Sequence, residues 1–323
     1  MKLIVAPDSF KGSLTAVQAA AAMAAGVTRA RADATVLQIP LADGGEGTVD
    51  ALVRALGGTR VTVKVQDPIG RLVRATLGLL TGDTAVIEMA AASGLPLLRG
   101  EERDPFRAGT FGTGQLIRAA LDRGVREIIL GVGGSATIDG GAGALQALGA
   151  RLLDASGDQI APGNAGLARL AAIDLRDLDP RARTARVRVA CDVRNPLTGP
   201  GGAAAVFGPQ KGARAEDIPR LDANLAHFAA VVRRDLGLDV ASPPGAGAAG
   251  GLTAGLLAIG ARIEPGIDLV LEATRFAAQL EGTDLVLSGE GKIDGQTAHG
   301  KVISGLLART SRAGVPLVAL AGA

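Results

Sequence analysis

The glycine-rich segment GVGGSATIDGGAG, residues 131–143, is the feature that most limits what this chain can fold into. Six of its thirteen residues are glycine, and it continues the apolar, strand-like stretch EIILGV. Glycines at the end of a strand let backbone N–H groups approach an anion, helped by the positive end of the following helix. The segment therefore predicts an α/β protein with a ligand-binding loop at the carboxyl end of a strand.

The N-terminal part of the chain alternates strand patterns with helix patterns. A strand, a helix, a strand and a helix are expected at 2–6, 16–30, 34–41 and 48–56. Thr15 and Gln18 have the spacing of a capping box, which predicts the start of the first helix. This order of elements is typical of a parallel sheet covered by helices.

The pattern changes after the second helix. Residues 59–68, 71–80 and 84–90 alternate apolar and polar side chains around turn signals, which predicts antiparallel hairpins. This change favours a domain boundary near residue 62. Further along the chain, strands are expected at 127–132, at 187–193 and within 283–294, and helices at 113–123, 142–150 and 216–236.

The composition excludes several classes of protein. The net charge is only +2 and phenylalanine is the one aromatic residue type, so nucleic acid is not an expected partner. Cys191 is the single cysteine, which excludes a disulfide within the chain and fits a cytoplasmic protein. No uncharged apolar run reaches membrane-spanning length, so no membrane partner is expected. A homo-oligomer is compatible with the sequence.

The chain ends on an expected strand, VPLVALAGA. In an α/β domain a helix should follow such a strand. A further C-terminal segment of that domain is therefore expected.

Several expected strands end in loops that combine glycine with an acid. They are PDSFKGS, LADGGEG, GVGGSATIDGG, ACDVRNPLTG and LSGEGKIDGQT. Ligands of open α/β sheets bind outside the carboxyl ends of the strands. Glycine loops suit phosphate groups, and Asp or Glu beside them suits Mg²⁺, which takes one or two carboxylates plus phosphate oxygens. Together with isolated lysines, these loops predict a phosphoryl-transfer site.

Other interpretations of the glycine-rich segment stay open. Gly131-x-Gly133-x-x-Ala136 has the spacing of a dinucleotide fingerprint, and Asp154 lies about where a ribose-binding acid is expected. However, three later glycines would then fall inside a helix, where each costs about 1 kcal/mol relative to alanine. The alternatives to phosphoryl transfer are an NAD-dependent oxidoreductase using Gly131 to Ala136, and a non-catalytic small-anion binding protein.

Some candidate residues also have a purely structural interpretation. Asp43 and Asp294 suit ordinary turns, and Glu46 suits the N-terminus of a helix. Asp192 and Asn195 suit an Asx turn before a proline.

The cysteine and the two histidines call for separate interpretations. Cys191 is expected to be a small core residue, and His227 is expected to be structural on an amphipathic helix. His299 lies in a glycine loop and is a ligand candidate.

Taken together, the motifs resemble the bacterial glycerate kinase family, the type without a P-loop. The matching stretches are APDSFKGSL, IPLADGGEGT, EMAAASGL, GTGQLIRAAL, GVGGSATIDGGAGALQALG, ACDVRNPLTG, AVFGPQKGA, GAAGGL and SGEGKIDGQTAHGKV. They run from one end of the chain to the other in the family's order, so the signal is highly specific.

The resemblance implies an α/β fold with two domains and a reaction. One domain would be a flavodoxin-like parallel-sheet domain formed by both chain ends, residues 1–62 plus 282–323. The other would be an inserted mixed α/β domain, residues 63–281. The implied reaction is ATP-dependent phosphorylation of D-glycerate to 2-phosphoglycerate with Mg²⁺, a glycerate 2-kinase activity, in a cleft between the domains.

Loop position and residue type then assign roles within that reaction. The candidate catalytic residues are Lys11, Asp192 and Lys301. The candidate ATP-binding residues are Gly133, Gly134, Ser135, Thr137, Gly140 and Lys211. The candidate glycerate-binding residues are Asp8, Ser9, Asn195 and His299. The candidate Mg²⁺ ligands are Asp43, Glu46, Glu290 and Asp294.

Overall fold

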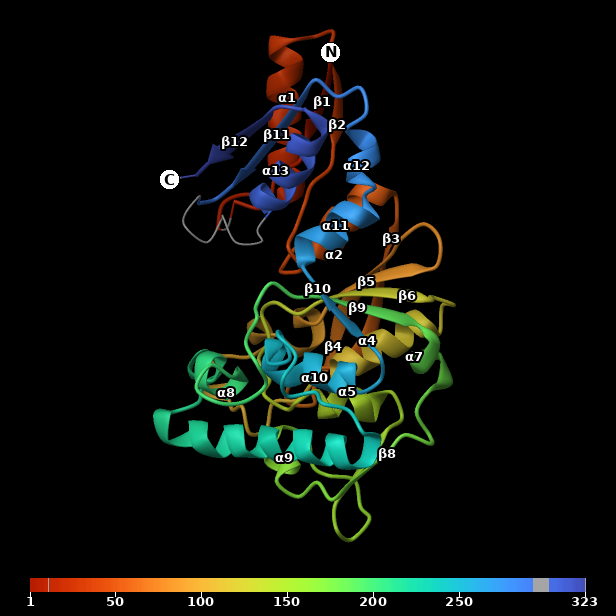
Figure 1. The fold of residues 1–323 in the computed structure, drawn as a ribbon, viewed down its shortest axis with the longest axis vertical. Coiled ribbons are helices and arrows are strands. Elements are labelled where there is room, and N and C mark those ends of the chain that lie inside the picture. Colours follow the sequence, from red (N-terminus) through yellow and green to blue (C-terminus); the bar gives the residue numbers. More distant parts are fainter. Residues whose placement is uncertain (11, 293–301, 323) are drawn as a thin grey trace.

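Two sheets organise the computed structural model of this chain, which describes residues 1–10, 12–292 and 302–322. One sheet has four strands and the other has six, and a two-stranded ribbon completes the described strands. Figure 1 shows the four-stranded sheet above the six-stranded sheet along the long axis of the molecule. This arrangement confirms the expected fold class, an α/β protein with one parallel and one mixed sheet.

The four-stranded sheet is built from both ends of the chain. Its order is β12-β11-β1-β2 and all its pairs are parallel. The strands are β1 (Lys2–Val5), β2 (Thr35–Gln38), β11 (Leu285–Glu290) and β12 (Leu317–Ala321). Helix α1 (Ala16–Ala30) joins β1 to β2, and α13 (Val302–Ala313) precedes β12. The predicted capping box at the start of α1 is confirmed, because Thr15 and Gln18 exchange both hydrogen bonds.

The six-stranded sheet has the order β10-β9-β6-β5-β4-β3. Its strands are β3 (Thr59–Gln66), β4 (Leu72–Leu79), β5 (Thr84–Glu88), β6 (Glu127–Gly131), β9 (Arg186–Ala190) and β10 (Arg262–Glu264). The predicted hairpin set is confirmed, since β3–β4 and β4–β5 are antiparallel, whereas β5, β6, β9 and β10 are parallel. The boundary expected near residue 62 falls inside β3, and the domain limits stay a prediction.

The ribbon and the remaining helices complete the fold. The ribbon pairs β7 (Arg151–Leu153) with β8 (Ala172–Asp174). The remaining α-helices are α2 (Thr48–Leu56), α3 (Ala90–Ser93), α4 (Phe111–Leu121), α5 (Ala142–Ala147), α6 (Asn164–Leu167), α7 (Pro180–Thr184), α8 (Ala203–Phe207), α9 (Ile218–Leu236), α10 (Leu252–Leu257), α11 (Gly266–Ala273) and α12 (Phe276–Gln279). Within the described residues, every helix is too short or too polar to cross a membrane.

The central strands of the six-stranded sheet are buried on both faces. Successive residues of a strand point to opposite faces, and in β5 both Val86 and Ile87 are fully buried. Ile87 belongs to the larger apolar cluster, which includes residues of α4 and α5. Val86 belongs to a second cluster that also contains Ile4 of β1, Leu52 of α2 and Val270 of α11. Helices α2 and α11 therefore fill the space between the two sheets.

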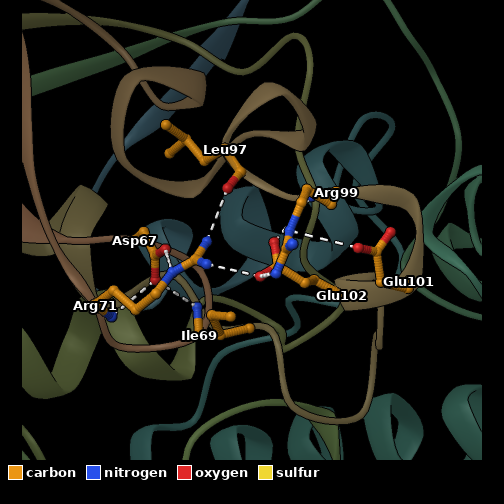
Figure 2. Close-up of polar contacts among 7 residues, drawn as sticks. All are labelled: Asp67, Ile69, Arg71, Leu97, Arg99, Glu101 and Glu102. Carbon is orange, nitrogen blue, oxygen red and sulfur yellow. Dashed lines mark hydrogen bonds and ion pairs between the residues drawn. The ribbon is translucent and has the colours of Figure 1, made fainter.

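A polar network fixes the turn that joins β3 to β4. Figure 2 shows Arg71 bonded to Asp67, to Glu102 and to the carbonyl oxygen of Leu97. Asp67 is buried and also accepts the backbone N–H of Ile69. The network ties the end of the hairpin to residues 97–102, so the hairpin has a fixed position against the rest of the sheet.

Candidate active site

Three strand-end loops touch each other backbone to backbone. A Cβ atom on Gly131, at the end of β6, would collide with the carbonyl oxygen of Gly44. A Cβ on Gly133 would lie 3.0 Å from the Cα of Gly45. A Cβ on Gly44, whose φ is +91°, would lie 2.6 Å from the Cβ of Ala190, at the end of β9. The glycines of these loops are therefore needed, at least in part, for contact between the two sheets.

A hollow of about 930 Å³ opens beside the loop after β2, whereas Gly133, Gly134 and Asp192 are not among the residues that line it. We call it the acidic hollow, because five carboxylates line it: Asp8, Asp43, Glu46, Asp50 and Glu88. Its walls come from both sheets, since residues of β3 and β4 also line it. The predicted residues Asp8, Ser9, Asp43 and Glu46 thus lie around one space.

The acidic hollow suits a hard cation with few protein ligands. Within the described part of the chain, no group of three or more His, Cys, Asp or Glu side chains has the geometry to hold a metal by itself. Mg²⁺ usually keeps several waters and uses one or two carboxylates with substrate phosphates. Two acids of the loop after β2, Asp43 and Glu46, meet that requirement.

Asp192 lies just past β9, close to the charge of Asp43. Its Oδ1 accepts the backbone N–H of Gly266, at the start of α11, over 2.8 Å. Although part of the residue is exposed, surrounding protein removes water from the carboxylate and raises its pKa to about 6, and the charges of Asp43 and Asp268 add to the rise. An acid with this pKa is ionised at neutral pH and can still accept a proton.

Glu88 lines the acidic hollow but was not among the predicted residues. It ends β5 and accepts the backbone N–H of Val49, at the start of α2, over 2.8 Å. Burial raises its pKa, and the nearby carboxylates of Asp50 and Glu46 act in the same direction. The rule that selected the other acids would have found it, because Glu88 also stands at the carboxyl end of a strand.

The glycine-rich loop after β6 has an exposed part and a buried part. Gly133 and Gly134 are exposed, and Gly134 has a φ of +71°. Ser135, Thr137 and Gly140 are buried. Two backbone N–H groups at the exposed turn are therefore the part of the loop that a phosphate can reach.

Lys211 lies beneath this turn, with 1% of its surface exposed. Its ammonium donates to Ser135 Oγ over 2.7 Å and to the Thr137 carbonyl oxygen over 2.8 Å. Burial lowers the pKa of Lys211 to about 7, and the charge of Asp139 opposes part of that change. Lys211 therefore supports the loop from inside the protein.

We expect Lys211 to make stability depend on pH. An unfolded lysine has a pKa of about 10.4, so between pH 7 and 10 the unfolded chain binds more protons than the folded one. The free energy of unfolding of the wild type should therefore rise relative to that of Lys211→Met by up to about 1.4 kcal/mol per pH unit. Urea unfolding at pH 7, 8 and 9 measures this, with the exposed Lys64→Met as control. A difference that does not change with pH would contradict the assignment.

Asp139 is the acid within the glycine-rich loop after β6. It is fully buried, and burial raises its pKa. Its Oδ2 accepts the N–H and the hydroxyl of Thr110 and the N–H of Gly143, and its Oδ1 accepts the N–H of Gly141. Asp139 thus joins the starts of α4 and α5, and its role in the described structure is to hold the loop.

Asp139→Asn should lower the free energy of unfolding by about 1–3 kcal/mol. The asparagine amide keeps the shape of the aspartate side chain. However, its NH₂ group is a donor and would face backbone N–H donors, so hydrogen bonds on that side are lost. Thermal and urea unfolding measure the loss, and Asp158→Asn, in an exposed turn, serves as the control. Unchanged stability would show that these hydrogen bonds are not needed.

The other predicted residues fall into three groups. Asn195 donates its amide to the carbonyl oxygen of Gly201 and lies in the loop after β9. Glu290 is buried at the end of β11, one residue from Gly289, whose carbonyl oxygen accepts the N–H of Asp8. Four predicted residues lie outside the described residues: Lys11, Asp294, His299 and Lys301.

The structural interpretations of two residues are confirmed. Cys191 is buried, and burial raises the pKa of its thiol. His227 lies on α9 with its Nε2 2.7 Å from the carbonyl oxygen of Leu170. Asp154, the candidate ribose-binding acid, accepts N–H bonds within its own turn and pairs with Arg169.

Known proteins resemble this chain over its whole length. Residues 3–323 match the model of the Glycerate kinase family. A Glycerate kinase of Halalkalibacterium halodurans is 52% identical over 99% of this chain and 85% of the relative, and the Glycerate 2-kinase of Escherichia coli is 47% identical over 100% and 85%. A crystal structure from Salmonella typhimurium LT2, described as a glycerate kinase 2, superposes with a TM-score of 0.95 at 50% identity, over 99% of this chain and 86% of that one.

Proposed function

Because this chain belongs to the glycerate kinase family, we propose that it transfers the γ-phosphoryl group of ATP to a hydroxyl of D-glycerate, giving 2-phosphoglycerate. The observation that carries the proposal is the acidic hollow, where loops from the carboxyl ends of strands in both sheets meet. We infer that this hollow is the interdomain cleft in which both substrates bind. A reducing cytoplasm, which suits the free thiol of Cys191, is the proposed compartment.

Asp43 and Glu46 would hold Mg²⁺, which would neutralise charge on the phosphates of ATP. Both side chains line the hollow, and the Asp43 carboxylate already has one oxygen fixed by the N–H of Gly45 at 3.2 Å. The proposed ligands Glu290, at the end of β11, and Asp294, further along the chain, would contribute to the same metal site. Asp8 and Ser9 would contact glycerate, as would Asn195 and His299.

The exposed turn at Gly133 and Gly134 would bind the phosphates of ATP through its backbone N–H groups. Lys211 would act from beneath by fixing Ser135 and Thr137, and Gly140 would keep the rest of the loop in place. Lys11 and Lys301 are the proposed cations for the transferring group.

Asp192 would orient the attacking hydroxyl and accept its proton. Its pKa of about 6 leaves it ionised at pH 7. Because phosphoryl transfer has a loose transition state, positioning and charge stabilisation matter more than the strength of the base. Replacing a residue that binds the cation should therefore cost more activity than replacing Asp192.

³¹P NMR of a reaction with ATP, Mg²⁺ and D-glycerate tests the function and the regiochemistry together. The expected product is 2-phosphoglycerate with stoichiometric ADP. A signal of 3-phosphoglycerate would correct the regiochemistry, and no glycerate-dependent loss of ATP would reject the kinase activity. A thermal shift with NADH but not with a non-hydrolysable ATP analogue would favour the oxidoreductase alternative.

A further inference from the structure

One wall of the acidic hollow is a face of the β3–β4 hairpin. Arg60 and Thr62 are two residues apart on β3, so they point to the same face, and Thr76 of β4 lies opposite Thr62. These three residues line the hollow. The hydroxyls of Thr62 and Thr76 are 3.0 Å apart. This wall therefore presents a guanidinium and two hydroxyls to whatever binds in the hollow.

The charges of the lining residues make this wall important for binding an anion. Five carboxylates line the hollow, and Arg60 is the single cation among the lining residues that the structure describes. A small anion that entered this space would be repelled by these five carboxylates. A bound cation offsets the repulsion for phosphates, but the carboxylate of an organic acid needs a donor of its own. The planar guanidinium of arginine matches a carboxylate with two parallel hydrogen bonds.

Arg60 is free to exchange its partner. Within the described chain it pairs with Asp50 alone, at 2.9 Å, and 58% of its side chain is exposed. An exposed pair of this kind contributes only about 0–1 kcal/mol. Arg71, at the other end of the same hairpin, is different, because Asp67, Glu102 and Leu97 hold its guanidinium in place (Figure 2). Arg60 therefore has both the location and the available donors of a ligand-binding residue.

We propose that Arg60 binds the carboxylate of the hydroxy-acid substrate, with Thr62 and Thr76 beside it. The proposal rests on the proposed function and names the residue that selects an acid over a neutral alcohol. It gives the hairpin a role in recognising the substrate, in the same hollow as the acids that serve phosphoryl transfer. Binding by Arg60 would release Asp50, so the ion pair with Asp50 would exist only in the free enzyme.

Steady-state kinetics of Arg60→Met test the proposal. The KM for D-glycerate should rise about 10–100-fold, the loss expected for a charge-assisted hydrogen bond, whereas the KM for ATP should stay within about threefold. Discrimination between glycerate and its neutral amide, glyceramide, should fall by a similar factor. Arg74→Met, which removes an exposed arginine of the same hairpin that does not line the hollow, should leave these values unchanged.

Asp50→Asn separates ligand binding from a structural role of the ion pair. It removes the partner of Arg60 but keeps the guanidinium, so the KM for D-glycerate should not rise. If Asp50→Asn raises that KM as much as Arg60→Met does, or if Arg60→Met raises the KM for ATP instead, the inference is wrong. A wild-type enzyme that does not phosphorylate glycerate would reject the proposed function, and the inference with it, before any variant is compared.

Discussion

Asp43→Asn is expected to lower kcat about 10³-fold, the order of magnitude associated with losing a group that stabilises charge in the transition state. The asparagine oxygen can still accept the N–H of Gly45, so the turn should survive. The negative charge that would bind the cation is lost. Turnover measured against Mg²⁺ concentration should show a much higher requirement for the metal.

The same variant has a second readout at Asp192. In the metal-free enzyme the Asp43 charge contributes to the raised pKa of Asp192, so its removal should lower that pKa, which an NMR titration without Mg²⁺ would show. Asp33→Asn, in the exposed turn before β2, is the matched control and should change neither value. Activity within a fewfold of wild type in folded Asp43→Asn would remove this residue from the site.

Asp192→Asn is expected to lower kcat about 10²-fold, at the low end of the range for a general base, because a loose transition state needs little proton transfer. The amide oxygen can still accept the N–H of Gly266, so the loop after β9 should stay in place. In the wild type, kcat should fall as pH drops through about 6, because protonation removes the charge on Asp192. In the variant this acid limb should disappear.

Circular dichroism and thermal unfolding would show whether Asp192→Asn is folded. The control is Asp268→Asn, since Asp268 also adds negative charge near Asp192 but pairs with Arg309 and does not line the hollow. An acid limb that persists unchanged in Asp192→Asn would assign the titration to another group.

Most of the fold could be predicted because its signals are local. The capping box at Thr15 and Gln18, the alternation along β3 and β4, and the strand into the glycine-rich segment each depend on neighbouring residues. The shared sheet of β1 and β11 could not be derived from such signals. It depends on pairing between residues such as Leu3 and Leu285, and only the resemblance to a family implied it.

The site was predicted less completely, because burial and contact across the fold decide it. Glycine beside an acid marked the loop of Asp43, which lines the acidic hollow, but no local signal indicated that Lys211 points into the protein. Arg60 could not be predicted because it lies inside a strand, whereas glycine and acid signals mark only the ends of strands. Its place in the hollow follows from how the hairpin stands against the other sheet.

The apolar layer formed by α2 and α11 has a consequence for motion of the enzyme. Val49 of α2 and Ile267 of α11 belong to one continuous cluster with residues of both sheets, rather than to two cores joined by a flexible linker. Well-packed side chains resist gaps, so approach of the two halves around a substrate should proceed by sliding of these helices over small distances instead of a wide swing. Turnover should then be sensitive to the volume of side chains in this layer.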